Sequence, residues 1–225
     1  MNLLELPKIP ANLSHERCHV NIIKLDSPRF VSSIISAMIS ESLKTEMDSH
    51  ADSPVLGDNV EIIKLMDKEV TVSGFSDKLG NISKIPVVQA VVAYDFVITN
   101  KTYLLHINNT LYVKGMKSNL IPPFMMRLNG IEVNECPKFL SSNPSEKGHT
   151  IYIYIPDGQL HIHLFLDGTI SFFNTRKPTK DELMYMDEYF DLTPPSEDWN
   201  PFDESFSSQE EAMMDDSCDI RPTKK

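Results

Sequence analysis

The sequence has little that would mark a small secreted scaffold or a membrane protein. It contains only three cysteines in 225 residues, Cys18, Cys136 and Cys218. An odd number, spread this widely, argues against a disulfide framework and for a reducing compartment. No apolar run approaches the roughly 20 residues that cross a bilayer, and residues 1–10 do not resemble a signal peptide. These absences predict a soluble, cytoplasmic protein without a membrane partner.

Basic residues are missing where the acidic residues gather. The formal net charge is −11, and residues 181–219 contain 14 Asp and Glu but no Lys or Arg. Residues 1–180 contain 18 acidic and 18 basic side chains, so this larger part is neutral. A nucleic-acid-binding surface requires a clustered basic patch. We find none in the sequence, so no direct binding to nucleic acid is expected.

The pattern of apolar residues predicts a mainly β chain with a few short helices. Residues 1–42 form an N-terminal extension with one amphipathic helix, which begins at Ser27-Pro28 and ends near Ser42. Over residues 43–140, runs rich in Val, Ile, Tyr and Phe alternate with Gly, Asn, Asp and Ser, a pattern typical of antiparallel strands. One helix, from Pro122 to Asn129, interrupts these strands and stops at Gly130.

A second β segment, combined with a helix, occupies residues 141–192. Its three strands, joined by Asp-Gly turns into a meander, are expected at 151–155, 160–166 and 169–173. Thr179 and Glu182 form a capping box at the start of the helix. The apolar face of this helix consists of Leu183, Met186 and Phe190. Residues 193–225 are expected to form an acidic, disordered tail that solubilises the chain or, alternatively, binds a partner.

The stretch most informative for function runs from Met47 to Gly57 and reads M-D-S-H-A-D-S-P-V-L-G. Its pattern is D-S-x-A-D, with an apolar residue before the first aspartate and an apolar pair after the second. This pattern resembles the catalytic loop, D-[ST]-G-A, of retropepsins, the aspartic proteases of retroviruses and retrotransposons. The same residues would also suit an ordinary turn, because Asp and Ser cap their own backbone.

A second match lies farther along the chain. The segment from Asn108 to Ile121 resembles the form N-x-L-Y-V-P-x-x-x-x-N-L-[LI] that closes the protease domain of copia-type retroelements. In that family a final apolar strand and a short helix pack beneath the catalytic loop. The resemblance covers residues 44–215 and is strongest over 47–139. Because integrase, polymerase and zinc-knuckle patterns are lacking, the chain corresponds to a fragment of such a polyprotein.

The resemblance implies a retropepsin-like closed β-barrel over residues 43–140 and an aspartic endopeptidase that processes its own polyprotein. Asp48 would be the catalytic residue. A retropepsin subunit supplies one such Asp, so the carboxylate pair exists only in a symmetric homodimer. Water is the nucleophile, the substrate is a polypeptide, and no cofactor or metal is implied.

The resemblance also assigns roles to the neighbours of the catalytic residue. Ser49 would bond across the dimer axis and Ala51 would let the loop pack tightly. Asp52 would tie the loop to neighbouring backbone or to a basic side chain. A flap hairpin would extend over residues 73–88, with Gly80 near its tip.

The loop departs from the family pattern at His50, where retropepsins have Gly. A glycine there allows a tight turn, whereas a positive φ at a histidine is uncommon. The ring of His50 would block substrate, shift the pKa of the carboxylate pair, or be accommodated by a widened loop. Pro54 and the Ile121-Pro122 pair also depart from the pattern. The alternative function is therefore a catalytically inactive relic or interaction module that retains the fold.

Two groups of histidines could begin a metal site. His161 and His163 are two residues apart on a predicted strand, so they share a face, but no third ligand has convincing spacing. His15, Cys18 and His19 lie close together in the sequence without a distant partner pair. We therefore expect no metal in either place.

Overall fold

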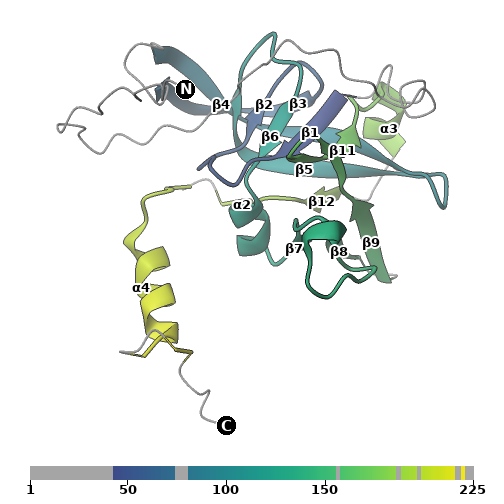
Figure 1. The fold of residues 1–225 in the computed structure, drawn as a ribbon. Coiled ribbons are helices and arrows are strands. Elements are labelled where there is room, and N and C mark those ends of the chain that lie inside the picture. Colours follow the sequence, from purple (N-terminus) through teal and green to yellow (C-terminus); the bar gives the residue numbers. More distant parts are fainter. Residues whose placement is uncertain are drawn as a thin grey trace, which may run out of the picture.

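The computed structural model describes residues 43–73, 81–155, 158–185, 189–196, 199–215 and 219–220. The helix expected before Ser42 and the flap residue Gly80 lie outside the described residues. The described part confirms a mainly β chain with a few short helices (Figure 1).

One large mixed sheet contains nine strands. They are β1 (Leu43–Met47), β2 (Val55–Leu56), β3 (Glu61–Ser73), β4 (Asn81–Phe96), β5 (Lys101–Tyr112), β6 (Asn119–Ile121), β10 (Phe165–Asp167), β11 (Ile170–Thr175) and β12 (Tyr189–Asp191). The order is β10-β11-β1-β6-β2-β5-β4-β3, and β12 also pairs with β5. The strand β1 lies between β11, which is antiparallel to it, and β6, which is parallel to it. As paired among the described residues, this sheet has two ends, β10 and β3, so the pairing does not itself close a barrel.

A smaller sheet of three strands has the order β7 (Glu132–Asn134), β8 (Thr150–Ile155) and β9 (Gly158–His163). The expected single meander is thus divided between two sheets. Its first strand, β8, lies between β7 and β9, whereas its last part forms the β10–β11 hairpin beside β1. Alternation of side chains tells which face of a strand is buried but not which strand lies beside it, and this explains the difference.

The helices are short. They are α2 (Pro123–Leu128), α3 (Lys180–Tyr185) and α4 (Glu204–Met213), with a 3-10 turn at Lys138–Leu140. The helix α2 begins after Pro122, and Gly130 follows it with a φ of 77°, as the sequence predicts. Phe190, expected on the helix that follows the capping box, lies instead in β12, because Tyr189–Asp191 pairs in parallel with β5.

One hydrophobic core joins the two predicted domains. Val92, Leu105 and Ile121 from the first part pack in the same cluster as Ile151 and Phe173 from the second, and all five are fully buried. The strand β11 also supplies an edge neighbour to β1. Residues 43–140 and 141–192 therefore share a core and a sheet.

The segment expected to be a disordered tail contains ordered elements. Residues 193–196 lie against β5, and the α4 helix is capped by the Asp203 side chain, which accepts the Ser205 amide at 2.8 Å. Figure 1 shows α4 projecting from the body below α2. Polar contacts to β5 hold the start of this segment, and composition alone does not reveal such contacts.

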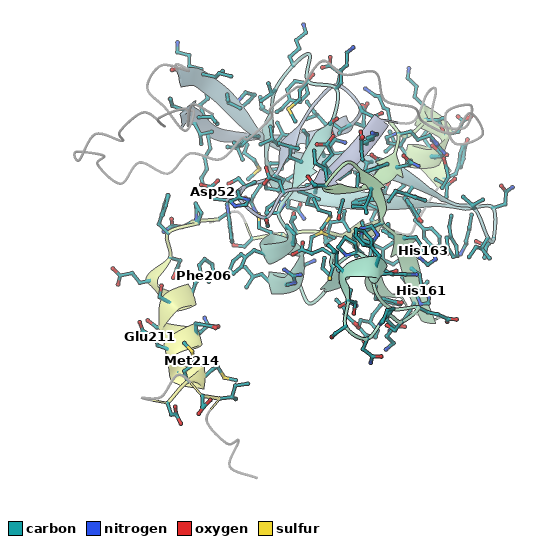
Figure 2. The ribbon with its side chains drawn as sticks, in the orientation of Figure 1. Asp52, His161, His163, Phe206, Glu211 and Met214 are labelled. Carbon is teal, nitrogen blue, oxygen red and sulfur yellow. The ribbon has the colours of Figure 1, made fainter. Side chains whose placement is uncertain are left out.

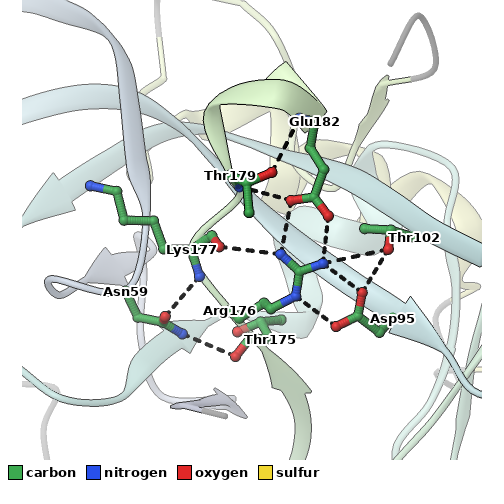
Figure 3. A network of polar contacts seen from close by, with 8 residues as sticks. All are labelled: Asn59, Asp95, Thr102, Thr175, Arg176, Lys177, Thr179 and Glu182. Carbon is green, nitrogen blue, oxygen red and sulfur yellow. Dashed lines mark hydrogen bonds and ion pairs between the residues drawn. The ribbon is translucent and has the colours of Figure 1, made fainter. Parts of the chain in front are cut away.

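Arg176 ties the end of β11 to β4 and α3 (Figure 3). Its guanidinium bonds both carboxylate oxygens of Asp95 at 2.7 and 2.8 Å and both oxygens of Glu182 at 2.8 and 2.6 Å. The predicted capping box is confirmed, since the Thr179 amide donates to Glu182 and the Glu182 amide donates to the Thr179 hydroxyl. The bonds from Arg176 are the main reason why the pKa of Glu182 falls to about 2.

Replacing Arg176 by Met is expected to lower the free energy of unfolding at pH 7 by about 1–3 kcal/mol, because two carboxylates lose a charged donor. The Asp95 pair contributes the smaller part, since that side chain is 55% exposed. A carboxylate with a depressed pKa stabilises the fold above its unfolded pKa, and the contribution disappears as the pH falls through the folded value. Urea unfolding should therefore show the deficit shrinking from about pH 4.5 toward pH 2.

The matched control is Lys177→Met. This neighbouring residue makes an exposed ion pair with Glu61 at 2.9 Å, so its loss should change stability by less than about 1 kcal/mol. Equal effects of the two substitutions would contradict the structural role given to Arg176.

Candidate active-site loop

The loop that carries Asp48 follows β1 directly and begins on a contact with β6. The Asp48 amide donates to the Ile121 carbonyl at 3.0 Å. The Asp48 side chain accepts the His50 amide at 2.9 Å, and the Asp48 carbonyl accepts the Ala51 amide at 3.3 Å. The loop is thus a tight turn closed by its own aspartate, as the simpler interpretation of D-S-x-A predicts. It also brings residues 47–57 against residues 108–121, which are distant in the sequence.

His50 fits this loop without backbone strain. Among the described residues it is not one of those with positive φ, and its side chain is exposed. Its Nδ1 lies 3.5 Å from the Ser49 hydroxyl. The backbone at His50 therefore does not need the conformation that only a glycine adopts easily.

A buried polar network lies beneath the loop. Asn119 is fully buried; its side-chain oxygen accepts the Gly57 amide at 3.1 Å, and its amide group donates to the Thr45 hydroxyl at 3.3 Å. The hydroxyl groups of Thr45 and Thr175 are 2.8 Å apart. Because buried polar groups are costly unless they are bonded, this network fixes β1, β6, β11 and the end of the loop relative to one another. Asn119 lies within the second motif, between Asn108 and Ile121, but the motif by itself does not predict this role.

A shallow pocket of about 210 Å³ lies beside Asp48. Besides Met47 to His50 it is lined by Glu135 and by Thr169 to Ser171 of the β10–β11 hairpin. The Ser171 hydroxyl lies 3.0 Å from Nε2 of His149. The late β segment, which a minimal protease does not require, therefore forms one wall of this pocket.

The other predicted residues of the loop occupy different environments. Ser49 and Asp52 are exposed, and Ala51 is half-buried. The Asp52 carbonyl accepts a hydrogen bond from the indole of Trp199 at 3.1 Å. Asp52 therefore connects the loop to another segment through its backbone carbonyl. The group that it binds is the indole N–H of Trp199 in the C-terminal segment. Sequence reasoning missed Trp199 because it lies far from the loop along the chain.

The paired histidines His161 and His163 lie away from Asp52, on the opposite side of the view in Figure 2. The ring of His161 packs edge-to-face on Tyr152 at 4.5 Å, and Nδ1 of His163 lies 3.3 Å from the Thr150 hydroxyl. Within the described residues, no three His, Cys, Asp or Glu side chains gather in a way that would hold a metal ion.

The pKa values of two histidines are lowered, and one of the two, His149, is buried, so the fold should be sensitive to mild acid. Burial, followed by the charge of Lys138, lowers the pKa of His149 and of His163. The pKa of such a histidine is lower in the folded state than in the unfolded chain. The histidine therefore stabilises the fold above the unfolded pKa, and this contribution to the free energy of unfolding is lost as the pH falls below about 6.5. The buried His149 adds a slope of up to about 1.4 kcal/mol per pH unit, and the exposed His163 contributes less because solvent screens its charge.

Replacing His149 by Gln is therefore expected to flatten the loss of stability between pH 7.5 and pH 5, because glutamine keeps a polar group near Ser171 without titrating. The measurement is urea unfolding at several pH values. If the free energy of unfolding falls equally steeply with pH in the parent and in the variant, His149 is not the group that causes the loss of stability.

Comparison of the sequence with protein-family models and with curated proteins, and of the fold with solved structures, gives no match. Among the described residues, no helix is both long and apolar enough to cross a membrane.

Proposed function

We propose that the chain is a retropepsin-like aspartic endopeptidase, derived from a copia-type retrotransposon, that works as a homodimer on its own polyprotein. The observation that carries the proposal is the 3.0 Å hydrogen bond from the Asp48 amide to the Ile121 carbonyl. It joins the two sequence segments on which the resemblance rests, and α2 follows the second segment directly. The long β3–β4 hairpin occupies the place in the chain where the flap is expected.

The proposed chemistry needs two chains. Two aspartates about 3 Å apart share one proton, because like charges at that distance do not both ionise. One carboxylate activates water, and the other protonates the tetrahedral intermediate. Asp48 is half-buried and lines an open pocket in the single chain, so it is accessible to a second copy. The proposal includes a retropepsin-like barrel over residues 43–140 of each chain, with Ser49 bonding across the dimer axis.

The second candidate function is a catalytically silent relic or an interaction module that keeps the fold. The observation that favours it is the bond from the His50 amide to the Asp48 side chain at 2.9 Å. One carboxylate oxygen of Asp48 thereby accepts a hydrogen bond within its own turn. An aspartate that only stabilises a turn makes the same bond.

Peptide cleavage separates the two candidates. Purified protein, shown to be dimeric by sedimentation, should cleave a mixture of unstructured peptides at acidic pH, and a pepstatin-type inhibitor should stop the cleavage. Absence of cleavage at every pH from 3.5 to 7.5 would favour the silent relic. Cleavage that resists the inhibitor would overturn the aspartic mechanism.

A further inference from the structure

The C-terminal segment is fixed to β5 in a single register. The strand β12 pairs in parallel with β5, and beyond it the Leu192 amide donates to the His106 carbonyl at 2.7 Å. The side chain of Leu192 is fully buried. Sliding β12 along β5 by one residue would move Leu192 out of the core, so the register of this pair is fixed.

Two adjacent asparagines of β5 extend this attachment. The Asn108 amide donates to the Thr193 hydroxyl at 2.7 Å, and that hydroxyl donates to the Asn108 carbonyl at 3.0 Å. The side chain of Asn109, a residue with a φ of 52°, donates to the carbonyl oxygens of Pro194 and Ser196. Both asparagines belong to the segment N-N-T-L-Y-V, so part of the second motif serves to hold residues 193–196.

From this anchored segment, Trp199 reaches the loop that carries Asp48. Its indole N–H lies 3.1 Å from the Asp52 carbonyl and 3.3 Å from the Ser53 hydroxyl. Its ring packs on Phe206 with centroids 5.9 Å apart, and Phe206 packs edge-to-face on Phe124 of α2 at 5.3 Å. Asp52 and Phe206 lie on the same side of the molecule in Figure 2.

The loop is therefore held at both ends. Its first residue, Asp48, is bonded to Ile121 of β6, and its last residues accept the Trp199 indole. The residue that follows them, Pro54, accepts the Leu111 amide through its carbonyl at 2.9 Å. The turn bonds of His50 and Ala51 shape the loop locally but do not attach it to the rest of the protein.

We propose that Trp199 is a positioning residue for the catalytic loop, and that the C-terminal segment acts as a strap that orients Asp48. The inference rests on the proposed function. A shared proton between two carboxylates requires each loop to stay within a fraction of an ångström of its productive place. Without the indole, the loop would be attached only at Asp48 and at Pro54, and the exposed residues between them would sample more conformations; an additional attachment reduces that freedom.

The kinetic test uses Trp199→Phe in the full chain. Phenylalanine keeps a ring against Phe206 but removes the indole donor, so the loop loses two bonds while the aromatic packing remains. We expect kcat to fall about tenfold, equivalent to one hydrogen bond of about 1.4 kcal/mol, with KM changed less than twofold. Tyr185→Phe, at an exposed aromatic residue of α3, is the matched control and should leave both constants unchanged. A variant with unchanged kcat, or with a raised KM alone, would overturn the positioning role.

Hydrogen exchange gives a readout that does not depend on catalysis. In Trp199→Phe the amides of residues 48–53 should exchange about tenfold faster, while amides of β4 and β5 keep their parent rates. Unchanged exchange in the loop overturns the inference whether or not the protein cleaves peptides. Faster exchange in a protein that cleaves nothing supports the strap and instead overturns the proposed function, so the two failures are distinguishable.

Discussion

Replacing Asp48 by Asn is expected to abolish peptide cleavage, with kcat/KM lowered by at least about 10³-fold. Asparagine has nearly the same shape and still offers an oxygen to the His50 amide, which lies 2.9 Å from the native carboxylate. The turn should therefore form as before. What the variant loses is the negative charge that activates water and the acid that protonates the intermediate.

The matched control is Asp67→Asn. Asp67 is exposed on β3, so the same chemical change there should leave cleavage within experimental error of the parent. Far-ultraviolet circular dichroism and sedimentation would establish that Asp48→Asn remains folded and dimeric. Cleavage that survives in Asp48→Asn would sink the assignment of an aspartic mechanism.

Replacing Gly57 by Ala is expected to destabilise the fold by roughly 3 kcal/mol or more. A Cβ at this position would lie 1.9 Å from the Met116 carbonyl oxygen and 2.6 Å from its carbon, and both are backbone atoms. The approach is held by several bonds, including the Asp58 amide to the Met116 carbonyl and the Val113 amide to the Leu56 carbonyl. Separating the two backbones would break these bonds and the bond from the Gly57 amide to Asn119.

Gly148→Ala serves as the control for this substitution. Its Cβ would meet the Ser145 carbonyl oxygen at 3.3 Å and the flexible Lys138 side chain at 3.5 Å, so a small shift relieves the contact. We expect a change of less than about 1 kcal/mol. Urea unfolding of both variants measures the difference, and a Gly57→Ala protein as stable as the Gly148→Ala protein would contradict the close approach.

The features that sequence reasoning predicted correctly are those made by neighbouring residues. The capping box of Thr179 and Glu182 and the start of α2 after Pro122 depend on bonds or steric rules that extend over about four residues. Phe190 shows where such reasoning ends. The helical spacing placed it with Leu183, but pairing with β5 made its segment a strand.

The candidate site divides in the same way. The predicted site residues, Asp48, Ser49, Ala51 and Asp52, lie within five consecutive positions. A sequence motif that identifies one of them therefore identifies the whole loop. The groups that surround the loop come from distant segments: the hairpin that includes Ser171 forms one wall of the pocket, and Trp199 binds the loop. Neither residue carries a local pattern that connects it to the loop.

By itself, the sequence determined the strand-rich character of residues 43–140, the local turns and caps, and the concentration of acidic residues after Asp181. The tertiary structure alone decided that β11 lies beside β1, that both predicted domains share one core, and that Tyr189–Asp191 of the acidic segment pairs with β5. The physical reason is that backbone hydrogen bonds along a strand edge are alike for every strand. Side-chain alternation selects the buried face, and the neighbour is chosen only when buried contacts such as those of Asn119 and Leu192 form together.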